Sequence, residues 1–293
     1  MLPPDIVKEL RYIEVYTAKK IRNMRVGAYT SRLRGSGFDF DEHRLYRAGD
    51  DVRRIDWNTT ARLGMPYMRE THAERELNVM IALDLSGSMA FGTGAGSKKR
   101  TMLLVAACLV FSAIADGVNT GFLTFTDRVI SYTPPRRTRA AAWSVLEELW
   151  NLDLPPAKTA VLSAARYLAG HLKRMNVIFL ASDFMTGEDL GTSRDMKMLA
   201  AHHDLVGVVV EDPAESTLLA GTGVVAMRDA ESGARLRVGL NPALRREYAA
   251  FAAERRADLV ESFYRVPMDH AFLRSDQPAL EPLLRLFLAR RRK

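Results

Sequence analysis

Three closely spaced residues near position 84 have the types and spacing to bind a hard divalent cation. Asp84, Ser86 and Ser88 alternate in the string DLSGSM, directly after the apolar segment NVMIAL. Alternate positions of a tight loop can place three side-chain oxygens on one side, and Gly87 eases the turn. One carboxylate and two hydroxyls suit Mg²⁺ or Mn²⁺, which take oxygen ligands in octahedral geometry. Three protein oxygens cannot enclose such an ion, so we expect further ligands from other loops.

Two later loops supply candidates for those ligands. Thr159 lies in the string PPAKTAVLSAA, and Asp183 directly follows the apolar segment NVIFLAS. Asp84 and Asp183 both fall at the ends of predicted strands, where parallel sheets bind their ligands. The predicted metal ligands are Asp84, Ser86, Ser88, Thr159 and Asp183. In the alternative interpretation the loop binds no metal, and its hydroxyls cap the helix that follows the first strand.

The elements that position these loops alternate along residues 77–293. Apolar strands followed by helices indicate an α/β fold, with a parallel sheet covered on both faces. We predict strands over residues 77–85, 120–125, 129–132, 176–182, 205–210 and 259–266, and a hairpin over 224–240. The predicted helices span residues 98–116, 137–150, 159–174, 188–203, 242–257 and 278–290.

The five predicted ligands resemble the metal-ion-dependent adhesion site of von Willebrand factor A domains. That pattern has Asp-x-Ser-x-Ser after the first strand, a Thr from a second loop and an Asp from a third, in the order found here. The resemblance implies a von Willebrand A-like doubly wound, mostly parallel sheet with helices on both faces. It also implies that an Asp or Glu of a protein partner completes the metal shell. Ser86, Ser88 and Thr159 would then ligate directly or through water, while Asp84 and Asp183 supply negative charge and orient water.

The segment before this domain resembles the bacterial DUF58 family, whose members contain a von Willebrand A-like domain. The family's characteristic stretch is matched by Tyr46, Gly49, Asp50, Arg53, Ile55, Asp56, Trp57, Ala61 and Arg62. The final segment FLRSDQPALEPLLRLFLARRR is also similar to the family's closing helix, so the resemblance covers residues 25–290. DUF58 proteins commonly occur beside MoxR-type AAA+ ATPases, which implies an ATPase of this type as a possible partner.

Residues 1–76 are predicted to form an N-terminal helix and an irregular DUF58-type extension with short strands, packed on a main domain of residues 77–293. Residues 38–76 are charged and rich in turns, and they lack the apolar runs needed for a core of their own. The arginines and aspartates of the Gly49–Arg62 stretch have two interpretations. Either they form ion pairs that hold the extension on the sheet, with Trp57 as an apolar anchor, or the arginines face a partner.

Composition favours an ordinary globular protein and excludes several classes. The chain has 293 residues, of which 47% are apolar and 26% charged, so it can form a core. A single cysteine, Cys108, excludes a disulfide framework or a cysteine-rich zinc site. The longest apolar run, residues 102–115, is shorter than the about 20 residues that a membrane span needs. The N-terminus has no features of a secretory signal, so we expect a cytoplasmic protein without a membrane span.

The net charge of +7 raises the question of an anionic partner. The excess lies in two segments without acids, residues 19–37 and 285–293, and the rest of the chain has an acidic balance. These segments lack interleaved aromatic residues and any known nucleic-acid reader motif, so a nucleic-acid or anionic-surface binder is a third interpretation that rests on the two basic segments alone. A single carboxylate at the predicted metal is the anionic group that we favour.

Enzyme motifs are absent around the predicted site. Residues 92–100 (GTGAGSKKR) lack the spacing of a Walker A motif, and no Gly-x-Ser-x-Gly elbow surrounds Ser86 or Ser88. The third position of the Asp84 string is a serine, which excludes an Asp-x-Asp phosphoryl acceptor. No His or Glu close in sequence offers a general base. We therefore predict a non-enzymatic, metal-dependent interaction protein; the alternative is a metal-activated hydrolase that uses the same pocket.

Overall fold

The computed structural model describes residues 2–21, 42–47, 50–70, 78–93, 97–136, 139–152, 157–174, 176–218, 220–231 and 233–291. Its contacts divide the chain into two compact units, residues 1–31 with 77–293, and residues 32–76. Most of the basic segment 19–37 lies outside the described residues, and so do the last two residues of the basic C-terminal tail.

The larger unit is built on a six-stranded sheet with the order β10-β7-β6-β3-β4-β5. Its strands are β3 (Asn78–Asp84), β4 (Asn119–Phe125), β5 (Val129–Arg136), β6 (Asn176–Ser182), β7 (Asp204–Glu211) and β10 (Asp269–Arg274). All neighbouring pairs are parallel except β4 and β5. Every residue of β3 and β6 is buried, as continuous apolar strands of a covered parallel sheet require. The predicted α/β fold with a mostly parallel sheet is confirmed.

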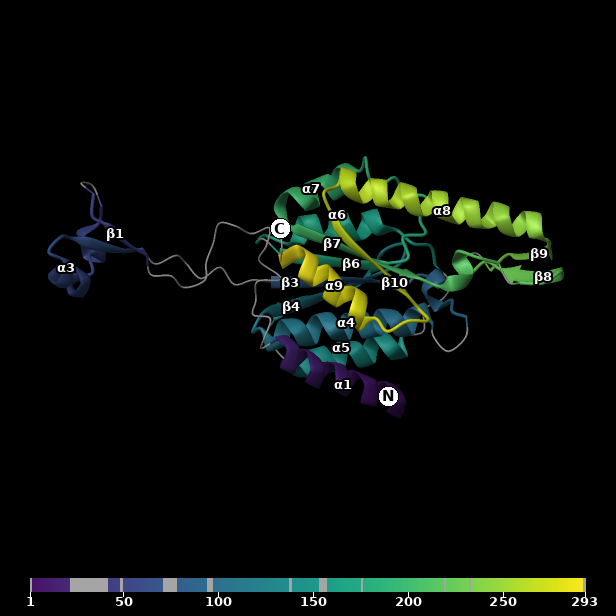
Figure 1. Ribbon diagram of the computed structural model, residues 1–293, viewed down its shortest axis with the longest axis horizontal. Helices are drawn as coiled ribbons and strands as arrows, with labels where there is room; N and C mark the ends of the chain where they lie inside the picture. Colours follow the sequence, from purple (N-terminus) through teal and green to yellow (C-terminus); the bar gives the residue numbers. More distant parts are fainter. Residues whose placement is uncertain are drawn as a thin grey trace. The chain divides into compact units, whose positions relative to one another are not determined.

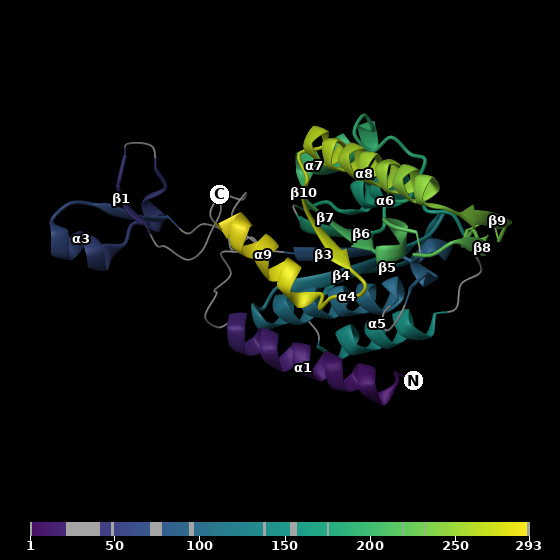
Figure 2. The same ribbon diagram turned by 45° about the vertical axis from the view of Figure 1, so that its right-hand side comes forward.

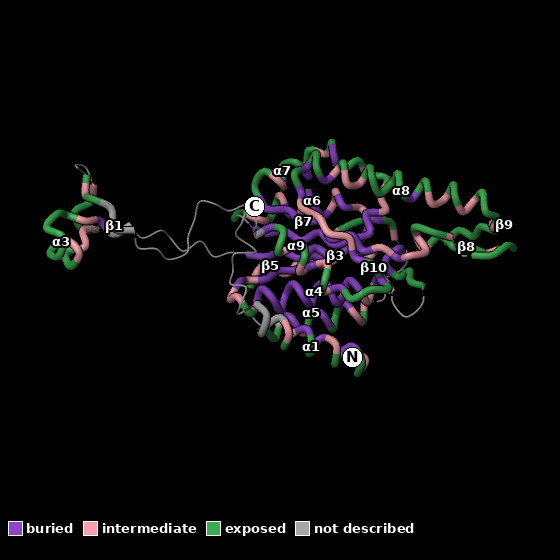
Figure 3. Tube along the Cα trace, in the orientation of Figure 1, coloured by how far each residue is buried: buried purple, intermediate pink, exposed green. Residues whose placement is uncertain are grey.

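Helices cover both faces of this sheet (Figure 1, Figure 2). One face carries α1 (Pro4–Ile21), α4 (Lys98–Ala115), α5 (Arg139–Asn151) and α9 (Leu280–Arg291). The other carries α6 (Val161–His171), α7 (Arg194–His202) and α8 (Pro242–Arg265). Side chains of β3 alternate between the two cores, with Ile81 and Leu83 in the first and Met80 and Ala82 in the second. The buried tube in Figure 3 follows these central strands.

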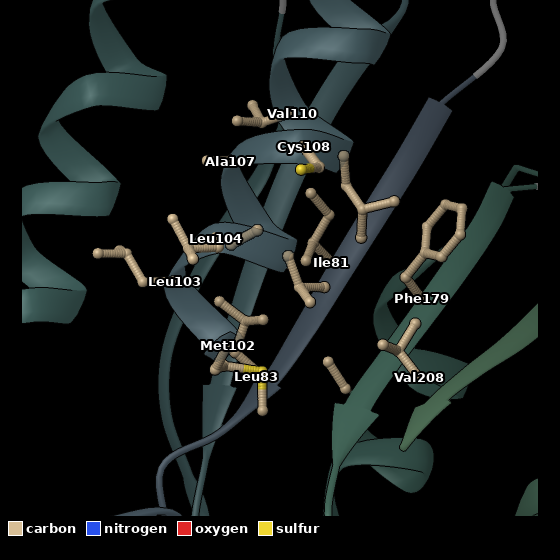
Figure 4. Close-up of a cluster of buried hydrophobic side chains, with 14 of the residues drawn as sticks. Ile81, Leu83, Met102, Leu103, Leu104, Ala107, Cys108, Val110, Phe179 and Val208 are labelled. Atoms are coloured by element: carbon tan, nitrogen blue, oxygen red, sulfur yellow. The ribbon is translucent and has the colours of Figure 1, made fainter. Parts of the chain in front are cut away.

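The apolar run near residue 108 forms the helix α4, which is buried on nearly all sides. Figure 4 shows Met102 and Cys108 of α4 beside Ile81 and Leu83 of β3. Burial raises the pKa of the Cys108 thiol to about 12, as expected for a small buried apolar residue. Within the described residues, no helix combines the length and apolar character needed to cross a membrane.

The N-terminal helix α1 covers the outer side of α4. Ile6, Leu10 and Ile13 lie on its buried face and join the same core as α4. These contacts group α1 with the larger unit, although it precedes the extension in the chain. The division by contacts therefore differs from the predicted one, which assigned the whole of residues 1–76 to the N-terminal part.

The predicted strand over 259–266 is wrong. The helix α8 continues to Arg265, and the last strand is β10, which begins at Asp269. Side chains from this segment that reach the core are spaced as on one helical face: Ala252, Leu259, Phe263 and Val266. The short apolar and aromatic run after residue 258 thus belongs to a helix that contacts the core through one face.

Two smaller sheets complete the structure. The predicted hairpin over 224–240 is confirmed as β8 (Gly223–Arg228) and β9 (Arg235–Leu240), both largely exposed. The smaller unit pairs β1 (Glu42–Leu45) with β2 (Tyr67–Glu70) around the turn η1 (Val52–Arg54) and the helix α3 (Trp57–Leu63).

The smaller unit is held by caps and turns more than by a core. Asp56 begins α3 by accepting the backbone N–H groups of Asn58 and Thr59, at 3.0 and 3.1 Å. Asp51 caps η1 in the same way. No residue of α3 is buried, and Trp57 is 67% exposed, so Trp57 anchors no core within this unit. Gly49 of the DUF58 stretch lies outside the described residues.

Candidate metal site

The five predicted ligands meet at one edge of the large sheet, at the carboxyl ends of β3 and β6. Asp84 is the last residue of β3, and Asp183 directly follows β6. Thr159 lies just before α6, in a loop joined to the β3 loop by a bond from the Gly87 N–H to the Ala157 carbonyl, at 3.0 Å. The strand ends therefore place the two acids, and this backbone bond places the threonine.

The three predicted hydroxyl ligands form one buried cluster. The Oγ atoms of Ser86 and Ser88 are 3.1 Å apart, and Thr159 Oγ1 lies 2.8 Å from Ser86 Oγ. All three residues are buried. Ser88 belongs to the turn η2 (Gly87–Ala90), and Ser86 makes no side-chain cap to it. The hydroxyls thus face one another. The metal-free alternative would instead require them to cap a helix and, over the residues that the structure describes, Ser86 caps neither η2 nor another helix through its side chain.

Asp84 is fully buried, and its hydrogen-bond donors among the described residues are neutral. Its Oδ1 accepts the Ser86 N–H at 2.8 Å, and its Oδ2 accepts the Ser182 hydroxyl at 2.5 Å. Burial and, secondarily, the negative charge of Asp183 raise the pKa of Asp84 from 3.8 to about 7. The ionised carboxylate is therefore costly in this site unless a cation lies near it.

Asp183 is held by a buried lysine that sequence analysis did not identify. Lys98 Nζ lies 2.7 Å from Asp183 Oδ2 and also pairs with Glu215. The other oxygen, Asp183 Oδ1, accepts the Met185 N–H at 2.9 Å. Burial would lower the pKa of Lys98, but the charges of Asp183 and Glu215 raise it, so Lys98 is a permanent cation here. Asp183 is consequently fixed in orientation.

Glu215 is positioned by the turn η3 (Pro213–Glu215) through a capping box. Asp212 accepts the Ala214 N–H at 3.0 Å, while the Asp212 N–H donates to Glu215 Oε2 at 2.9 Å. Asp212 also accepts hydroxyl protons from Thr93 and Ser275, at 2.5 and 2.7 Å. These hydrogen bonds therefore fix the position of Glu215, which pairs with Lys98.

A second acid that sequence analysis missed, Glu231, reaches the hydroxyl cluster from the β8–β9 turn. Its Oε1 lies 3.4 Å from Thr159 Oγ1. A Cβ atom at Gly87 would lie 2.3 Å from the carbonyl oxygen of Ala230, so only glycine allows this approach of the turn. Neither Lys98 nor Glu231 belongs to a motif, and only the folded chain brings them to the site.

The donor set fits a hard divalent cation. Two carboxylates and three hydroxyls supply the oxygen chemistry that Mg²⁺ and Mn²⁺ prefer, and the raised pKa of Asp84 marks a charge that a cation would stabilise. Among the described residues, no cluster of three or more Asp, Glu, His or Cys side chains could hold a metal. A site of this kind depends on hydroxyls and water rather than on a cage of acids.

Comparisons with known proteins agree with one family. Residues 42–258 match the family described as "Protein of unknown function DUF58". The uncharacterised proteins Rv1480 of Mycobacterium tuberculosis and Mb1516 of Mycobacterium bovis are each 30% identical over 291 residues, which cover 99% of this chain and 91% of each relative.

Solved structures similar to this chain include two bacterial proteins. One is the conserved hypothetical protein BatB from Bacteroides thetaiotaomicron, with a TM-score of 0.47 and 14% identity, covering 74% of this chain and 100% of that one. The other is a von Willebrand factor type A protein from Catenulispora acidiphila, with a TM-score of 0.41 and 11% identity. That match covers 75% of this chain and 43% of the other chain.

Proposed function

The chain belongs to the DUF58 family, and from that premise we propose that it is a metal-dependent protein–protein interaction module. The metal is Mg²⁺ or Mn²⁺, bound at a site of the metal-ion-dependent adhesion type. The residues that hold it are Asp84, Ser86, Ser88, Thr159 and Asp183. The bound cation would supply a positive charge and an open coordination position for an acidic side chain of a partner.

The observation that supports this proposal is the pairing of clustered hydroxyls with a buried acid that lacks a cation. Ser86, Ser88 and Thr159 form a chain of close oxygens beside the fully buried Asp84. Asp84 ends a buried strand whose five preceding residues are apolar, and the donors of its hydrogen bonds are neutral. A divalent cation offsets the charges of Asp84 and Asp183 together.

The partner in this proposal contributes an Asp or Glu to the metal. A carboxylate bound to a partly buried cation gives a strong, charge-assisted contact at one point of a larger interface. We include a MoxR-type AAA+ ATPase as the partner system that the family resemblance implies, acting in the assembly, maturation or regulation of other proteins.

A metal-activated hydrolase is the second candidate, because Glu231 places a carboxylate beside Thr159 that could serve as a general base. The sizes of the neighbouring cavities favour the interaction module. The cavity lined by Asp84 and Ser86 has a volume of about 90 Å³, the one lined by Asp183 and Glu215 about 220 Å³, and Glu231 lines neither. Small-molecule sites commonly enclose about 300–1,000 Å³.

The proposed function is tested by metal-dependent stabilisation of three proteins: the wild type, Asp84→Asn and the matched control Asp127→Asn. Asp127 is an exposed acid in the turn between β4 and β5, outside the hydroxyl cluster. Mg²⁺ at 100 times its dissociation constant stabilises a binding protein by about 2.7 kcal/mol. We expect a rise in melting temperature for the wild type and Asp127→Asn, and none for Asp84→Asn. Equal shifts in all three would contradict the proposal.

The partner is tested by capture from lysate on the wild type and on Asp84→Asn, each with Mg²⁺ and with a chelator. An AAA+ ATPase retained only by the wild type with Mg²⁺ is the expected result. If the ATPase is retained equally with the chelator and on Asp84→Asn, the interaction does not depend on the metal. Metal-dependent hydrolysis of phosphoesters or peptides that Glu231→Gln abolishes would instead favour the hydrolase.

A further inference from the structure

The turn between β8 and β9 is seated on the loop that carries Ser86 and Ser88. The carbonyl oxygen of Ala230 fills the space where any side chain at Gly87 would lie. Within the turn, Asp229 Oδ1 accepts the Glu231 N–H at 3.0 Å, and the Asp229 N–H donates to the Ala234 carbonyl at 2.8 Å. These bonds define the conformation of the turn, and Glu231 at its tip faces the hydroxyl cluster.

Glu231 lies beside the threonine of the hydroxyl cluster. Its Oε1 lies 3.4 Å from Thr159 Oγ1, which is itself 2.8 Å from Ser86 Oγ. Glu231 is therefore the third acid at this edge, after Asp84 and Asp183. Lys98 already pairs with Asp183, whereas a cation bound at the hydroxyls would attract Asp84 and Glu231 as well.

The rest of the hairpin is held weakly. Its strands are mostly exposed, with Val224 at 74% and Leu236 at 65% exposure. The two strands form a sheet of their own and pair with no strand of the large sheet. An isolated two-stranded hairpin is at best marginally stable in water. Contacts at the tip, around Gly87 and Thr159, therefore contribute much of what keeps the hairpin in place.

We propose that Glu231 is an internal ligand of the metal site, whose carboxylate takes the coordination position that a partner's Asp or Glu would take. The inference rests on the proposed function. Internal and external carboxylates are the same chemical group and compete for one position on one cation. The hairpin β8–β9 must therefore move away from Thr159 before a partner's acid can bind the metal.

The first test measures Mn²⁺ binding by calorimetry to the wild type, Glu231→Gln, Glu231→Ala and Asp127→Asn. Loss of a carboxylate that supports a metal site weakens affinity by about 10- to 100-fold. We expect a loss of at least about tenfold for both Glu231 variants, and less than twofold for Asp127→Asn. In the wild type, Mn²⁺ should slow amide hydrogen exchange at residues 229–234; in Glu231→Gln it should not.

The second test uses acetate as the external carboxylate, with Mn²⁺ present. Excess acetate should restore fast exchange at residues 229–234 of the wild type, and acetate should bind Glu231→Gln more tightly than the wild type. Equal Mn²⁺ affinities in all four proteins, with unchanged exchange at the hairpin, would overturn the internal ligand and leave the proposed function standing. Absence of Mn²⁺ binding to the wild type would overturn both.

Discussion

Two buried charge clusters lie at opposite edges of the same sheet, and they are satisfied differently. At the amino-terminal edge, Arg290 of α9 pairs with Asp204 and with Asp269, the latter at 2.9 Å. At the carboxyl edge, Lys98 of α4 pairs with Asp183 and Glu215, but the donors to Asp84 in the described part of the chain are a backbone N–H and serine hydroxyls. One edge is a structural ion cluster, whereas the other leaves one buried carboxylate for a cation to stabilise.

The difference separates what the fold needs from what the site needs. The planar guanidinium of Arg290 contacts two acids at once and closes the cluster from a helix packed in the core. Within the described ranges, no arginine or lysine pairs with Asp84 at the carboxyl edge, where an exposed hairpin supplies a further acid. Buried groups that oppose stability are concentrated at functional sites, and the carboxyl edge has that character.

The largest loss of stability is expected when a buried cation is removed, as in Arg290→Met. Removing one partner of a buried ion pair leaves an uncompensated charge and costs about 3–5 kcal/mol. Urea unfolding should show this loss, and Mg²⁺ should not restore it, because the described residues place no hydroxyl cluster beside Arg290. Arg285→Met is the matched control, since its pair with Glu281 is exposed and is worth less than about 1 kcal/mol. A comparable loss of unfolding free energy in both variants would show that the buried ion pair contributes no more to stability than the exposed one.

Lys98→Met should cost about as much, about 3–5 kcal/mol, because it also leaves two largely buried acids without their cation. Here we expect Mg²⁺ to recover part of the loss, since a cation beside Asp183 replaces the missing charge. The measurement is urea unfolding with Mg²⁺ and with a chelator. If Mg²⁺ restored the stability of Arg290→Met but not that of Lys98→Met, the cation would act at the amino-terminal edge and not at the carboxyl edge.

The sequence predicted the parts of this arrangement that depend on local patterns. Apolar runs located the central strands, and a string of spaced polar residues located Asp84 and its serines. Lys98 and Glu231 escaped prediction because each stands in a segment whose local pattern is ordinary, a helix start and a hairpin turn. Their roles arise from contacts across 85 and 72 residues of sequence. The end of α8 escaped for a different reason, since a short apolar run does not distinguish a strand from one helical stripe.

Asp84→Asn should stabilise the metal-free protein by about 1–3 kcal/mol above pH 7. Because the pKa of Asp84 is raised from 3.8 to about 7, the folded protein retains a proton that the unfolded chain releases in this range. Wild-type stability attributable to Asp84 therefore falls as the pH rises from about 4 to 7. The variant lacks this fall, so the difference in unfolding free energy should vanish near pH 4 and grow towards pH 7. Urea unfolding in chelator across this range measures it, and a constant difference would contradict the assigned cause.

The smallest loss of stability is expected from Gly87→Ala. This substitution tests whether the hairpin at the carboxyl edge can move more easily than the strands of the large sheet. The added Cβ would lie 2.3 Å from the Ala230 carbonyl oxygen, so either the Ser86 loop or the hairpin must move. We expect the exposed hairpin to move, at a cost of about 1 kcal/mol or less, with faster hydrogen exchange at residues 229–234. Gly121→Ala is the matched comparison, because its Cβ would meet backbone atoms of Thr133 and Pro135 at 2.8 Å inside the large sheet. That substitution should cost more and leave the hairpin unchanged. If Gly87→Ala were the more destabilising of the two, the hairpin would be as rigidly held as the sheet and could not give way to a partner.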